Sequence, residues 1–149
     1  MNRHSAVVML AVLFSIGCSQ TTPLTSAEDA SDTVITKDRV GNYVIGKSTL
    51  TEILGDDTPE ARTRFAKEGL NFEFDRGVTL TGVTVSSPRY RMANGLVAGS
   101  SVDDVRKALG EPNQTEIASE KFRIDALVYD DFTFILNDDQ VGAIRIGSK

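Results

Sequence analysis

The chain has 149 residues, of which 40% are hydrophobic and 25% charged, an ordinary composition for one globular domain. Its formal net charge of -5 argues against the basic surface that neutralises nucleic-acid phosphates, so no nucleic-acid partner is expected. The single cysteine, Cys18, and the single histidine, His4, both lie near the N-terminus. The rest of the chain therefore has no Ser-His-Asp triad, no Cys-His pair and no Cys/His zinc site.

The first 17 residues are typical of a secretory signal peptide. Arg3 and His4 precede an uncharged apolar run over residues 6–16, which is shorter than the roughly 20 helical residues needed to span a bilayer. The run ends in the letters SIGC, and this sequence resembles the lipobox of bacterial lipoproteins. The resemblance implies that residues 1–17 are removed and that Cys18 carries the lipid. The alternative is an ordinary secreted protein with a free thiol.

Residues 18–33 are expected to tether the domain to the membrane. After the cysteine they are rich in Ser, Thr, Ala and acidic residues and almost without apolar ones, a composition that predicts flexibility. The folded domain is then residues 34–149, held close to a membrane of the cell envelope. Ser19 resembles the residue that follows the lipidated cysteine in outer-membrane lipoproteins. In a Gram-negative host this resemblance implies an outer-membrane protein that faces the periplasm.

Two segments of the domain, at about 41–86 and about 95–147, repeat one pattern. In each, apolar residues lead to a glycine, and a hydroxyl residue then caps a short run with apolar residues at helical spacing. A glycine ends each run, and a proline follows. These signals predict helices over residues 50–54 and 102–109. The matching residues are Gly46 and Gly99, Thr49 and Ser101, Gly55 and Gly110, and Pro59 and Pro112.

After each predicted helix the apolar residues alternate, which is typical of strands joined as hairpins. The predicted fold class is α+β, with two tandem helix-plus-antiparallel-hairpin units that form one sheet and pack their short helices on one face. The predicted strands cover residues 64–67, 69–74, 78–85, 126–129, 131–136 and 141–146.

This two-copy pattern of glycine, capped helix, Leu-Gly and hairpin, over residues 40–147, resembles a fold shared by two families. They are the β-lactamase inhibitor protein and the SmpA/OmlA lipoproteins of the outer-membrane β-barrel assembly machinery. The resemblance implies a binding module of assembly-factor or inhibitor type. It assigns no contact residue.

Three short motifs are better explained by their place in the fold than by a catalytic, metal-binding or phosphate-binding role. Asp130 and Asp131 are predicted to point to opposite faces of a strand, so they are poor partners in acid-base catalysis. Residues 137–140, NDDQ, are typical of a hairpin turn and lack the long ligand loop of a calcium site. Residues 41–48 match the letters of a phosphate-binding loop, but the loop positions are bulky and no parallel β-α-β unit surrounds them. No metal and no cofactor are expected.

The connector between the two segments holds the candidate protein-binding residues Arg89, Tyr90 and Arg91, followed by Met92. These residue types are enriched at interface hot spots. The alternative is that Tyr90 covers one end of the core. The sequence thus predicts a lipid-anchored, non-catalytic protein-interaction module of the cell envelope, with a small-ligand or metal-binding envelope lipoprotein as the alternative, and we expect no enzymatic activity.

Overall fold

A computed structural model describes residues 33–119 and 124–147, so Cys18, the predicted signal peptide and almost all of the predicted tether lie outside the described residues. The fold is α+β, as predicted. The helices are α2 Leu50–Leu54, α3 Pro59–Lys67 and α4 Val102–Leu109. The strands are β1 Val34–Thr36, β2 Arg39–Val40, β3 Tyr43–Val44, β4 Leu70–Asp75, β5 Thr79–Val85, β6 Arg91–Met92, β7 Gln114–Ser119, β8 Ile124–Val128, β9 Phe132–Asn137 and β10 Gln140–Gly147.

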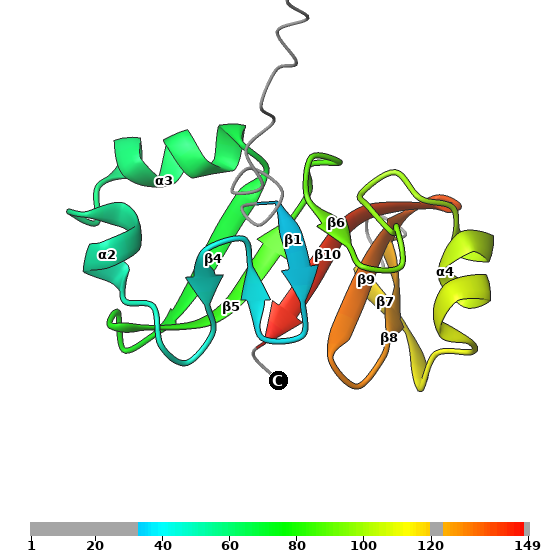
Figure 1. Cartoon of the computed structure of the whole chain (residues 1–149). Helices are drawn as coiled ribbons and strands as arrows, with labels where there is room; N and C mark the ends of the chain where they lie inside the picture. Colours follow the sequence, from blue (N-terminus) through cyan, green and yellow to red (C-terminus); the bar gives the residue numbers. More distant parts are fainter. Residues whose placement is uncertain (1–32, 120–123, 148–149) are drawn as a thin grey trace, which may run out of the picture.

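The described strands form two sheets. A six-stranded sheet has the order β4-β5-β10-β9-β8-β7, and all of its pairs are antiparallel. A four-stranded sheet has the order β3-β2-β1-β6, with β1 and β6 parallel. Figure 1 shows α2 and α3 on the left, next to the β4 end of the larger sheet, and α4 on the right.

The core lies against one face of the six-stranded sheet. Strand register places five apolar residues in one row across it, each at most 2% exposed. The same core cluster includes residues of the small sheet and of all three helices, so these elements cover this face. The row is Leu70, Val85, Ile144, Phe134 and Leu127.

The predicted helices at 50–54 and 102–109 are confirmed as α2 and α4. The Thr49 and Ser101 hydroxyls each accept a hydrogen bond from the backbone N–H three residues later, which satisfies an N–H group that a helix otherwise leaves without a partner. Gly55 and Gly110 follow the last turns with positive φ angles. Local sequence therefore decides where both helices begin and end.

Replacing the Ser101 cap with Ala tests this local control. We expect Ser101→Ala to lower the free energy of unfolding by about 1 kcal/mol, the usual cost of a lost N-cap. The Ser101 hydroxyl and backbone N–H hold the pKa of the Asp104 carboxyl below its usual value of 3.8. In the variant that pKa should rise towards 3.8, as measured by NMR titration of the Asp104 side chain, and urea denaturation measures the stability.

The contribution of the Asp104 carboxylate to stability should decrease in acid. Because the folded-state pKa of Asp104 is depressed, its contribution to stability is present above the unfolded-state pKa and is lost as pH falls through the folded-state pKa. The stability advantage of the wild type over Ser101→Ala should therefore shrink as the pH falls below the usual pKa of 3.8. An unchanged Asp104 titration in the variant would contradict this account of the cap.

The strand predicted at residues 64–67 is wrong, because these residues belong to α3. The Thr58 hydroxyl accepts from the N–H of Ala61 at 3.2 Å and caps this helix. A proline after a helix predicts that no helix resumes there, but Pro59 occupies the first turn of α3, where its missing N–H costs nothing. The positive charges of Arg64 and Lys67 in the last turn interact favourably with the negative end of the helix dipole.

The expectation of one sheet is also wrong, because the described residues form two. Strands β1 and β2 precede residue 41, outside both predicted repeats, and β7 follows α4 where no strand was predicted. The strands of the small sheet are two or three residues long, and β1 pairs with β2 on one side and gains its second partner because β6 lies beside it. Such pairing depends on residues far apart in the sequence, which periodicity cannot reveal.

Candidate functional site

The second face of the six-stranded sheet is left open by the described elements. Register places one residue from each of its six strands in a row across this face, and each is exposed or half-buried. We call this surface the open face. Its central row is Asn71, Thr84, Arg145, Thr133, Val128 and Gln114. A mostly polar face on one side of an antiparallel sheet is stable in water or against a polar partner.

One ion pair lies on the open face. Arg145 on β10 donates from Nη2 to Oε2 of Glu73 on β4 at 2.8 Å, across the intervening strand β5. Both side chains are more than a third exposed, so solvent screens the pair and its contribution to stability is at most about 1 kcal/mol. Its clearer effect is to hold two charged groups in a defined position on this face.

A hollow of about 870 Å³ opens at one end of the open face, and we call it the sheet-end hollow. Its lining comes largely from the β1–β2 turn, the end of β10 and the β8–β9 turn. These three segments lie at the lower end of the molecule in Figure 1. The volume of the hollow falls within the range of ligand pockets, but its lining is more polar than theirs. The lining residues are Lys37, Asn113, Gln114, Val128, Tyr129, Asp130, Asp131, Phe132, Thr133, Arg145 and Gly147.

The wall formed by the β8–β9 turn is held in place by hydrogen bonds. The Nδ2 group of Asn113 donates to Oδ1 of Asp130 at 2.7 Å, and the Tyr129 hydroxyl donates to the Gly110 carbonyl at 2.9 Å. The Tyr129 ring also packs edge-on against Phe134, with 5.7 Å between ring centroids. Burial raises the pKa of the Tyr129 hydroxyl above its ordinary value of 10, further from neutral pH.

Charges of opposite sign line the sheet-end hollow. Asp130 and Asp131 are exposed carboxylates on the β8–β9 turn, whereas Lys37 is exposed on the β1–β2 turn. The prediction that the two aspartates alternate along a strand is wrong, because both lie in the turn between β8 and β9. A turn does not impose the two-residue alternation of a strand, and both residues line the hollow.

The predicted protein-binding residues occupy different environments. Arg89 and Arg91 are exposed, but Tyr90 is only 4% exposed and Met92 only 5%. The guanidinium of Arg89 lies 5.9 Å from the centroid of the Tyr90 ring. Tyr90 therefore does not offer its ring to a partner, as the alternative interpretation foresaw, and a Tyr90 variant would test the core. Arg89 and Arg91 stay candidate binding residues, away from the sheet-end hollow.

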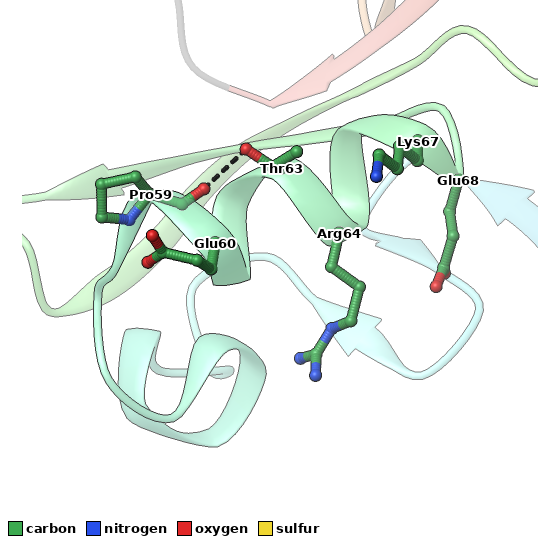
Figure 2. Close-up of a pocket in the computed structure, with 6 residues that line it drawn as sticks. All are labelled: Pro59, Glu60, Thr63, Arg64, Lys67 and Glu68. Atoms are coloured by element: carbon green, nitrogen blue, oxygen red, sulfur yellow. Dashed lines mark hydrogen bonds between the residues drawn. The ribbon is translucent and has the colours of Figure 1, made fainter.

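A second hollow, of about 540 Å³, lies along α3 (Figure 2). All its lining residues belong to α3 or follow it directly, and the charges of Glu60 and Glu68 oppose those of Arg64 and Lys67. The guanidinium of Arg64 lies 4.8 Å from the centroid of the Phe65 ring. One helix surface provides no facing wall, so this hollow is a weaker candidate than the sheet-end hollow.

Within residues 33–119 and 124–147, no three His, Cys, Asp or Glu side chains gather in a way that could hold a metal ion. Within the same ranges, no helix has the length and apolarity to cross a membrane.

Comparison with known proteins gives one structural likeness. No family model matches the chain, and no curated protein matches it. A crystal structure of a DUF4309 family protein, YjgB, from Bacillus subtilis is similar to it, with a TM-score of 0.49 and 13% sequence identity. The similarity covers 82% of this chain and 90% of that one, and at this level it assigns neither a family nor a function.

Proposed function

We propose that this protein is a lipid-anchored protein of the cell envelope that binds another protein through its open face and catalyses no reaction. The observation that carries the proposal is the open face itself, a mostly polar surface six strands wide that the described elements leave uncovered. A partner surface can reach it without any rearrangement of the core on the other face. The SmpA/OmlA and β-lactamase inhibitor resemblance favours an assembly factor or an inhibitor.

The same proposal includes a fold of two tandem units. In both halves, the first residue of the short helix donates its N–H to a carbonyl at the start of a strand, Leu50 to Val78 and Val102 to Asp139, at 2.8 and 3.1 Å. Two residues beyond each of these carbonyls, a strand N–H bonds back to a serine carbonyl. Those bonds run from Leu80 to Ser48 and from Val141 to Ser100, at 2.9 and 2.8 Å. Such matched attachments support a duplication.

The proposed anchor rests on the sequence around Cys18. Two or three acyl chains, at about 0.8 kcal/mol per buried methylene, would hold the domain on the membrane durably. In a Gram-negative host we place the protein at the outer membrane, facing the periplasm. Mass spectrometry of the native protein tests this directly. The mature chain should begin at lipidated Cys18, and an unmodified N-terminus at any other residue would overturn the anchor.

Site-specific photocrosslinking tests the protein-binding function. A benzophenone side chain placed at Thr133 should crosslink to a discrete partner protein in intact envelopes of the host, because Thr133 lies near the middle of the open face. The matched control is the same group at Asp56, an exposed residue between α2 and α3. If the interface is centred on this face, the yield of crosslinked adduct should be about fivefold higher at Thr133 than at Asp56. Equal yields, or no adduct at Thr133, would contradict the proposal.

A small-ligand function is the second candidate, and the volume of the sheet-end hollow favours it. A bound small molecule stabilises the folded state in proportion to its occupancy. A thermal-shift screen of metabolites and divalent cations would support this alternative if a compound raises the melting temperature of the wild type and fails to do so when Thr133 is replaced by Arg.

A further inference from the structure

We propose that the sheet-end hollow accepts an extended polypeptide segment of the partner, with a positively charged side chain at Asp130 and Asp131 and a negatively charged one at Lys37. The inference rests on the proposed protein-binding function and specifies the chemistry of the partner. It is carried by the shape of the hollow, by the two different turns that supply its opposite charges, and by the hydrogen bonds that hold one wall.

The floor of the hollow has the dimensions of a short stretch of extended chain. Four residues of the central row line it, one from each of β10, β9, β8 and β7. Neighbouring strands lie about 4.8 Å apart, so the floor is about 14 Å wide. An extended chain advances about 3.3 Å per residue, and about four residues cross that width. The four are Arg145, Thr133, Val128 and Gln114.

The charges give the bound segment a direction. Asp130 and Asp131 approach from the β8–β9 turn, and Lys37 approaches from the β1–β2 turn. Arg145, which also lines the hollow, is paired with Glu73. Asp38, the residue after Lys37, does not line the hollow, and it accepts from the Thr36 hydroxyl at 2.7 Å. Exposed charge pairs are each worth at most about 1 kcal/mol, so they select and orient a segment more than they hold it.

The acidic wall is organised before any partner arrives. The Asn113 amide holds one oxygen of Asp130 at 2.7 Å, and the turn closes with a hydrogen bond from the Tyr129 N–H to the Phe132 carbonyl at 2.8 Å. A carboxylate that is already positioned loses little conformational entropy when a cation binds it. A basic side chain is therefore the group that this wall is best arranged to receive.

The experiment uses NMR titration of the chain from residue 18 onward carrying Cys18→Ser, which keeps every described residue. The probes are capped six-residue peptides with a Gly-Ser centre and two charged ends. The mixed-charge peptides carry Asp at one end and Lys at the other, in both orders, whereas the other peptides are all-acidic, all-basic or neutral. For the wild type, a mixed-charge peptide should shift the amide signals of Thr133, Val128 and Gln114, and the neutral peptide should bind about five- to tenfold more weakly.

Two charge variants make the test specific. Lys37→Glu leaves both walls acidic, so the all-basic peptide should become the tightest binder. Asp131→Lys combined with Asp130→Asn leaves both walls basic, so the all-acidic peptide should become the tightest. The matched control, Lys107→Glu, removes an exposed cation from α4 outside the hollow and should keep the wild-type preference.

The peptide titrations can contradict binding of a charged segment without contradicting the proposed protein-binding function. One peptide preferred by all variants, or no shifts on the floor of the hollow, would overturn the inference. Equal shifts from free lysine and glutamate would overturn it too, because they would indicate a small charged molecule. Photocrosslinking at Thr133 would still report on the proposed protein-binding function in either case.

Discussion

Replacing Phe134 with Ala should lower the free energy of unfolding by about 3–5 kcal/mol. Phe134 is fully buried in the middle of the core row, between Ile144 of β10 and Leu127 of β8. Its ring also packs edge-on against Tyr129. Truncation would remove a large apolar side chain from water-excluded surroundings and leave a cavity that neighbouring strands, held by their ladder of hydrogen bonds, cannot close.

Urea denaturation followed by circular dichroism measures this loss, which should lower the midpoint and leave the slope unchanged. Phe132→Ala is the matched control on the same strand. Because Phe132 is only half-buried, its truncation should cost clearly less. Equal losses for the two variants would show that the core row does not lie where the structure places it.

Replacing Gly69 with Ala should lower the free energy of unfolding by about 2–4 kcal/mol, somewhat less than Phe134→Ala. Gly69 joins α3 to β4 with φ +77, a left-handed conformation that disfavours any residue with a Cβ atom. A Cβ atom at this position would also lie 2.6 Å from the Cβ atom of Ser87 and 2.7 Å from its backbone nitrogen. Relief would require the backbone of the connector to move, since the Gly69 carbonyl accepts from the Ser86 N–H at 2.8 Å.

Gly55→Ala separates the two causes. Gly55 has a similar φ of +70 after α2, but a Cβ atom there would have no neighbour within 4 Å. Its replacement should therefore cost only the conformational term, about 1 kcal/mol. Melting temperatures and urea midpoints of the two variants give the comparison. A Gly55 variant as unstable as the Gly69 variant would mean that the close approach of Ser87 has no effect.

Folding and the proposed binding depend on opposite faces of the six-stranded sheet. The two faces of the six-stranded sheet alternate along each strand, so the core row and the open face share a backbone but no side chains. Conservative changes at Thr133 or Gln114 should alter binding while stability stays within about 0.5 kcal/mol. Binding and folding can thus be examined by separate substitutions on the same strands.

The candidate site shows where sequence interpretation reached its limit. Tyr90 is a residue type common at interface hot spots, but its 4% exposure assigns it to the core. The adjacent Asp130 and Asp131 predict strand residues on opposite faces, whereas both lie in a turn and line the sheet-end hollow together with Lys37. The separation of 93 positions between Lys37 and Asp130 in the printed numbering left no local signal that they line one hollow.

The sequence by itself determined the parts of this protein that depend on neighbouring residues. These include the caps and ends of α2 and α4, the alternation that forms the two hairpins, and the α+β class. Only the tertiary structure decided that the strands form two sheets, that β1 pairs with β6, and that Tyr90 is buried. The physical reason is that caps and periodicity act within one or two turns of chain, whereas strand pairing, burial and hollows arise from contacts between distant segments.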